Sequence, residues 1–168
     1  VGLHIPDIRA GERTFQLLTQ VAGRAGRGEL EGEVVVQTYT PHHPSIQFAR
    51  HHDFEGFADQ ELQMRRQFGH PPYLHLVLIT SRSVHQQRAE FSLKTLHARL
   101  AKGLPNDMRL TEPLPSPLVK SHDQWRYQVI LKATSARKLA AYVSRVMRDL
   151  TFPSDVIVTV DVDPYSMG

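Results

Sequence analysis

The stretch that decides the fold runs from residue 73 to residue 102 and reads YLHLVLITSRSVHQQRAEFSLKTLHARLAK. Its opening residues, 73–80, are rich in apolar and aromatic side chains, which predicts a strand. The apolar residues that follow recur at helical spacing and predict a helix over residues 86–102. The face that this helix would bury consists of Ala89, Leu93, Leu96 and Leu100.

The rest of the C-terminal half continues this pattern. We expect a short strand near residues 108–113 and then a proline-rich turn at Pro113, Pro115 and Pro117. A strand over 124–132, a helix over 135–150 and a strand over 156–162 would follow. On residues 124–132 one face would carry Trp125, Tyr127, Val129 and Leu131. The order β-α-β-β-α-β is the ferredoxin-like plan, an α/β (α+β) domain over residues 73–168.

The residues before this domain predict mainly helices. Apolar spacing indicates helices over 11–26, 45–52 and 53–68, with Asp53 as N-cap of the last. The β-branched run at 33–39 predicts a strand. Gly69 and the Pro71-Pro72 pair would end the last helix, so we place a domain boundary there. We expect three parts, at residues 1–40, 41–72 and 73–168.

Charge is unevenly distributed along the 168 residues. The chain has 20 Lys and Arg against 17 Asp and Glu, a net charge of +3, which is too small to indicate nucleic-acid binding. Residues 1–70 carry 7 basic and 9 acidic side chains, whereas residues 71–168 carry 13 and 8. This difference of sign favours two units with different partners.

Several classes of site are disfavoured by composition. The chain has no cysteine, which excludes disulfides and a zinc ribbon and is compatible with the reducing cytoplasm in which we expect it. No apolar run is long enough to cross a membrane. The histidine pairs at 42–43 and 51–52 match no metal-ligand spacing, so no metal site is predicted. Asp161 and Asp163 are interpreted as strand-end and turn residues before Pro164.

The most specific stretch is QVAGRAGR, residues 20–27. It places Arg24 and Arg27 three residues apart near a helix end, each preceded by a glycine, Gly23 and Gly26. Two guanidinium forks with a closely approaching backbone suit a phosphate group. A glycine-terminated helix with two solvated arginines is the alternative. Chemistry alone leaves both open.

This stretch resembles motif VI of superfamily 2 helicases. The longer segment PDIRAGERTFQLLTQVAGRAGRG, residues 6–28, resembles one family more specifically, the bacterial primosomal replication-restart helicases known as primosomal protein N′. The resemblance continues through GEVVVQTYTPHHPSIQ (32–47), the helix before Pro71-Pro72-Tyr73, WRYQ (125–128) and DVDP (161–164). It therefore extends over the whole chain.

The resemblance implies a 3′-to-5′ ATP-dependent DNA helicase that binds stalled or branched forks and initiates primosome assembly for replication restart. Arg24 and Arg27 would be catalytic at the γ-phosphate, and Gln20, Gly23 and Gly26 would line the nucleotide site. ATP, Mg²⁺ and zinc would be cofactors of the full-length protein, and single-stranded DNA-binding protein and primosome proteins its partners. Residues 1–40 would be the tail of the second motor lobe.

The sequence also departs from that family in informative ways. It has no Gly-x-x-x-x-Gly-Lys-Ser/Thr phosphate loop, no acidic box and no cysteine, and its first residue is Val1. We therefore expect a fragment of a longer protein that neither hydrolyses ATP nor binds zinc alone. The rival hypothesis is a stand-alone nucleic-acid-binding or protein-binding module of ferredoxin-like fold.

Basic residues of the second half are candidates for contact with DNA or a partner. Phosphate contact by a spread of cations requires no base-reading motif. An ordinary solvated face is the alternative, and Trp125 and Tyr127 are expected to be buried rather than free to stack on bases. The candidates lie on the predicted strand and helix: Arg126, Lys132, Arg137, Lys138, Arg145 and Arg148.

Overall fold

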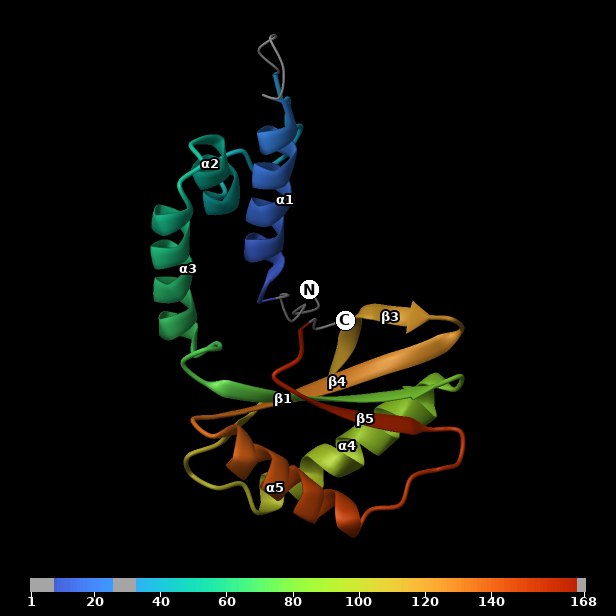
Figure 1. The fold of residues 1–168 in the computed structure, drawn as a ribbon. Helices are drawn as coiled ribbons and strands as arrows, with labels where there is room; N and C mark the ends of the chain where they lie inside the picture. The colour runs from blue at the N-terminus through green and yellow to red at the C-terminus, as the bar shows by residue number, and fades with distance from the viewer. Residues whose placement is uncertain (1–7, 26–32, 166–168) are drawn as a thin grey trace. The chain divides into compact units, whose positions relative to one another are not determined.

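A computed structural model describes residues 8–25 and 33–165 (Figure 1). The chain divides into two compact units, Ile8–Phe68 and a unit that begins at Gly69. Within the described ranges no helix has the length and apolar character that a membrane crossing requires. The predicted Gly26 and Arg27 lie outside the described residues.

The first unit is a cluster of three helices, which are α1 (Ala10–Ala25), α2 (Pro44–Arg50) and α3 (Phe54–Phe68). They share a small core in which the rings of Phe15 and Phe57 stack with centroids 4.3 Å apart. Asp53 caps α3 as predicted, since its Oδ1 accepts a hydrogen bond from Gly56 N at 2.8 Å. All three predicted helices are therefore confirmed, with ends shifted by one or two residues.

The predicted strand over residues 33–39 was wrong. Residues 33–38 have no regular secondary structure, and Val35 is 82% exposed. A strand needs a neighbouring strand to share its backbone hydrogen bonds, and no described strand pairs with these valines. β-branched composition alone cannot supply that neighbour.

The second unit contains a sheet with two helices packed on one face (Figure 1). All of its strand pairs are antiparallel, and the order β2-β4-β1-β5, with β3 also on β4, matches the ferredoxin-like plan. The predicted fold class is confirmed. Its elements are β1 (His75–Ser83), α4 (Gln86–Lys102), β2 (Arg109–Leu110), β3 (Leu114–Ser121), β4 (Gln124–Ala133), α5 (Ala136–Arg148) and β5 (Ile157–Val162).

The edge beside β4 differs from the prediction. The strand expected near 108–113 is only the two residues of β2. Of the prolines expected to form a turn, Pro115 and Pro117 instead lie in β3, which pairs with β4 through an irregular register between Pro115 and Lys120. Prolines are tolerated there because an edge strand needs hydrogen bonds on one side only. Thr111 N donates to Ile130 O at 2.9 Å, so contact with β4 continues between β2 and β3.

Successive side chains of β1 and β4 point to opposite faces of the sheet. Val77, Ile79, Val129 and Leu131 point toward α4 and α5 and are fully buried. All four predicted core residues of α4 are also buried in this cluster. Tyr127 is buried as predicted, whereas Trp125 is only partly buried at the margin. Among the described residues, no helix of this unit packs on the opposite face of the sheet.

Candidate functional site

The predicted nucleotide-site residues that the structure places lie on the last turns of α1. Gln20 and Arg24 are four residues apart and exposed, so they share one face of the helix. A Cβ added at Gly23 would meet no described atom within 4 Å. Steric crowding by described side chains therefore does not explain why position 23 is a glycine. The arrangement of Arg24 with Arg27 stays a prediction.

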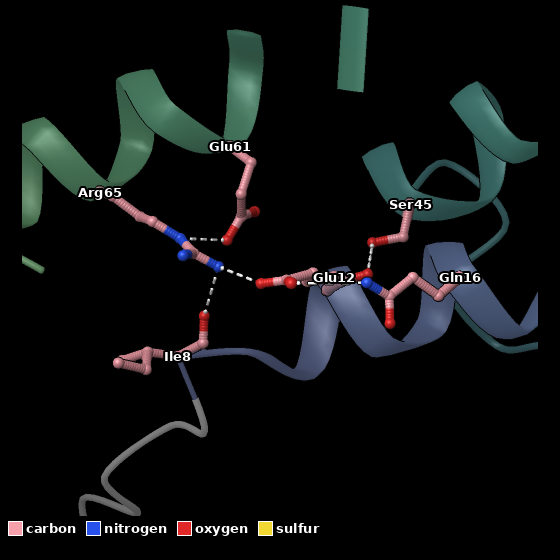
Figure 2. Close-up of polar contacts among 7 residues, drawn as sticks. Ile8, Glu12, Gln16, Ser45, Glu61 and Arg65 are labelled. Carbon is pink, nitrogen blue, oxygen red and sulfur yellow. Dashed lines mark hydrogen bonds and ion pairs between the residues drawn. The ribbon is translucent and has the colours of Figure 1, made fainter. Parts of the chain in front are cut away.

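Arg65 of α3 holds the beginning of α1 in place (Figure 2). Its Nη2 lies 3.0 Å from Glu12 Oε2 of α1, and its Nε lies 2.9 Å from Glu61 Oε1. Nη2 also donates to Ile8 O at 3.4 Å. Burial alone lowers the pKa of Arg65, but the hydrogen bonds and charges of Glu61 and Glu12 outweigh it, so its pKa lies above the ordinary value.

A second polar contact secures α1 from the side of α2. Ser45 Oγ donates to Gly11 O at 2.8 Å, and Ser45 is fully buried (Figure 2). Together the two contacts fix the helix that presents Gln20 and Arg24. Sequence reasoning missed both contacts. The i,i+4 spacing of Glu61 and Arg65 was visible, but Glu12 lies 53 residues away in sequence.

Replacing Arg65 with methionine should destabilise the three-helix unit by roughly 1–3 kcal/mol, because two half-buried carboxylates lose their shared cation. Thermal unfolding followed by circular dichroism at the helix band measures this. Trp125, the only tryptophan, lies in the other unit, so its fluorescence transition is an internal reference that should not move. Arg50→Met, at an exposed position of α2, is the matched control. An unchanged midpoint of the helical unfolding transition would show that Arg65 does not hold α1 against α3.

The six predicted contact residues separate onto two sides of the sheet unit. Arg126 and Lys132 lie on the sheet face without helices, because they alternate with the buried Tyr127, Val129 and Leu131. The other four lie on α5, which packs on the opposite face. One straight strand of DNA cannot contact both groups, so they are separate candidate surfaces.

The first surface, here called the α5 stripe, consists of the four cations Arg137, Lys138, Arg145 and Arg148. All four are exposed, and at 3.6 residues per turn they fall within an arc of roughly 100°. Lys138 Nζ is 3.2 Å from Asp107 Oδ2, and the Arg145 guanidinium lies 5.3 Å from the Tyr142 ring centroid. Arg137 and Arg148 have no ion pair with any residue in the described ranges.

A hollow of about 450 Å³ adjoins the α5 stripe. Met108 and Tyr142 contribute apolar surface to it, and Lys138 and Arg145 contribute charge at its margin. Tyr142 Oη donates to Leu100 O at 2.6 Å, and burial raises the pKa of this phenol. The stripe therefore offers both cations and an apolar recess.

The second surface is called the helix-free face and is defined by Arg82, Arg109, Arg126 and Lys132. Its residues form two cross-strand pairs, in which Arg82 lies directly opposite Arg126 and Arg109 directly opposite Lys132. Burial, followed by the charge of Arg109, lowers the pKa of Lys132. Sequence reasoning missed Arg82 and Arg109. Finding them requires the register of β1 and β2 against β4, which no single segment contains.

The two aspartates near the C-terminus lie at the end of β5 and just after it. Asp161 is exposed on β5, and Asp163 directly follows the strand with φ +48°. Asp163 Oδ2 lies 2.7 Å from His75 Nδ1, and Oδ1 accepts from Leu76 N at 3.0 Å. This confirms the interpretation as strand-end and turn residues. The described part of the chain holds no group of three metal-ligating side chains.

Comparison with known proteins gives a consistent picture. Residues 66–165 match the family model of the primosomal protein N C-terminal domain. The chain is 38% identical over 168 residues to the replication restart protein PriA of Bacillus subtilis. It is 36% identical to that of Synechocystis and 35% identical to that of Treponema pallidum. These alignments cover 98–99% of this chain but only 20–25% of the relatives.

Proposed function

The chain belongs to the primosomal protein N C-terminal domain family, and from this premise we propose that it is the DNA-contacting C-terminal part of an ATP-dependent 3′-to-5′ helicase for replication restart. It is homologous to replication restart proteins over nearly its whole length. The helicase activity, the binding of stalled or branched forks and the initiation of primosome assembly belong to the proposal.

The exposed end of α1 supports the motor part of the proposal. Gln20, Gly23 and Arg24 are exposed near the end of α1, and the contact of Arg65 with Glu12 holds the beginning of that helix. ATP and Mg²⁺ would also require a phosphate loop and an acidic box, which this sequence does not contain. We therefore expect no ATP hydrolysis by this chain alone. Zinc would need ligands other than cysteines of this chain.

The observation that carries the DNA part is the α5 stripe. Four exposed cations on one helix face, in a half of the chain with 13 basic and 8 acidic residues, suit the regular negative charge of a DNA backbone. Arg137 and Arg148 are not neutralised by any described carboxylate. The same contacts read no bases, so the proposed binding is independent of sequence.

The hollow beside the stripe favours a second candidate, the acidic tail of single-stranded DNA-binding protein. An acidic peptide would place carboxylates on Lys138 and Arg145 and an apolar side chain against Met108 and Tyr142. Both candidates use the same helix, so mutation of the stripe alone does not separate them.

Direct titration of the 168-residue chain separates the two candidates. Labelled fork DNA and a labelled acidic peptide are each titrated at two salt concentrations, with a neutral peptide of equal length as control. The proposal predicts fork binding that weakens steeply with salt and little difference between fork sequences. If only the peptide binds, the α5 stripe is a contact surface for a protein partner. If neither ligand binds, the proposal of DNA binding is wrong.

A further inference from the structure

The helix-free face brings two arginines together without a counter-charge. Arg82 of β1 and Arg126 of β4 are directly opposite in the antiparallel register, so their Cβ atoms lie about 4.5–5.5 Å apart on one face. Like charges in that position destabilise a sheet. Both side chains are half-buried, which weakens the screening that water provides. Neither has an ion pair with a residue in the described ranges.

The same face holds two buried hydrogen-bond donors that have no acceptor among the described residues. Arg82 Nε is buried and finds no acceptor among the described residues. Gln128 follows Arg126 by two positions on that face, is 1% exposed, and its Nε2 likewise has no described acceptor. Buried donors are normally satisfied, so an excess of them indicates a missing acceptor-rich group.

The strands beside the arginine pair do not supply that group. Ile157 of β5 lies opposite Arg82 and offers only apolar surface. Asp161, the β5 carboxylate on the same face, is four residues further along, or about 13 Å. On the other side of β4, the irregular segment of β3 between Pro115 and Lys120 passes Arg126, and no described acceptor there or elsewhere bonds to Arg82 Nε. The missing partner must therefore come from a ligand or from residues outside the described ranges.

We propose that Arg82 and Arg126 together bind a backbone phosphate of single-stranded DNA on the helix-free face. Two guanidinium groups on directly opposite residues supply several N–H donors to one phosphate. Lys132 lies on the same face six residues further along β4, or about 20 Å, and with Arg109 opposite it adds positive charge for a more distant phosphate of the same strand. Four cations on one face, of which Arg82 and Arg126 have no described counter-charge, suit the repeated negative charge of a nucleic-acid backbone. This inference rests on the proposed DNA function and adds a second contact surface opposite the α5 stripe.

The test compares Arg82→Gln/Arg126→Gln with Arg99→Gln/Lys102→Gln, which removes equal charge from the exposed end of α4. Binding of labelled oligo(dT) to the 168-residue chain is measured over a salt series. Each lost single-strand contact reduces the log–log slope by about 0.7, so the first variant should lose about 1.4 in slope and bind about 25-fold more weakly near 0.1 M salt. The control should bind like the wild type.

Repeating the comparison with the α5 stripe neutralised separates this inference from the proposed function. The same loss in that background supports the site even if the stripe binds no DNA. Equal binding by the two variants would overturn it. Loss of acidic-peptide binding with unchanged oligo(dT) binding would also overturn it, since the site would then recognise a protein.

Inorganic phosphate distinguishes a DNA site from a site for the free anion. In thermal unfolding followed by Trp125 fluorescence, phosphate should stabilise the wild type and the α4 control more than Arg82→Gln/Arg126→Gln. The variant should retain a cooperative transition, because the substitution removes a repulsive pair. If only this phosphate effect is lost and oligo(dT) binding is unchanged, the DNA assignment is wrong.

Discussion

Replacing Arg27 with alanine in the full-length protein should lower kcat for ATP hydrolysis by roughly 10³-fold or more. The resemblance of residues 20–27 to helicase motif VI places this guanidinium at the γ-phosphate, where it would stabilise charge that develops in the transition state. An interaction made mainly in the transition state is lost from kcat rather than from KM. Steady-state ATP turnover with saturating DNA measures the effect.

The control for this result is Arg50→Ala, which removes an exposed arginine from α2 in the same unit. It should leave turnover within about twofold of wild type, because surface substitutions away from special features have small effects. Wild-type turnover by the Arg27 variant would remove the catalytic assignment. A raised KM with normal kcat would limit the arginine to binding of the nucleotide.

Neutralising two cations of the α5 stripe, Arg137→Gln/Arg148→Gln, should weaken binding of duplex-containing fork DNA about 60-fold near 0.1 M salt. Each phosphate contact contributes about 0.9 to the log–log salt slope, so loss of two contacts removes about 1.8 orders of magnitude. These two positions are chosen because Lys138 already faces Asp107 and Arg145 already packs on Tyr142. Fluorescence anisotropy with labelled forks measures the change.

The loss should be equal for forks of different sequence, because phosphate contacts carry no base information. Arg99→Gln/Lys102→Gln on α4 again removes the same charge at a different place and should bind as the wild type does. A strong preference among fork sequences, or equal weakening by both variants, would mean that the helix face does not contact the backbone as proposed.

Local patterns predicted most of the sheet unit. The spacing of Ala89, Leu93, Leu96 and Leu100 predicted α4 with its observed bounds, and all four are buried. Gly69 was expected to end α3, and its φ of +59° is a conformation that glycine adopts without strain. Each of these signals lies within one helix or at its end.

Features that depend on distant partners were predicted poorly. The valines at 34–36 have strand character, but no strand among the described residues pairs with them. The prolines at 115 and 117 led to the prediction of a turn where an edge strand pairs with β4. The same limit applies to the candidate site. Arg126 was identified from its position on β4, but its partner Arg82 becomes visible only through the β1–β4 register.

The salt dependence of fork binding by the 168-residue chain tests the central claim most directly, which is that this domain holds DNA through phosphates on the α5 stripe. Three or four contacts predict a log–log slope near −3 for the wild type. For Arg137→Gln/Arg148→Gln the slope should be smaller in magnitude by about 1.8. A wild-type slope near zero, or the same slope in both proteins, would contradict the account.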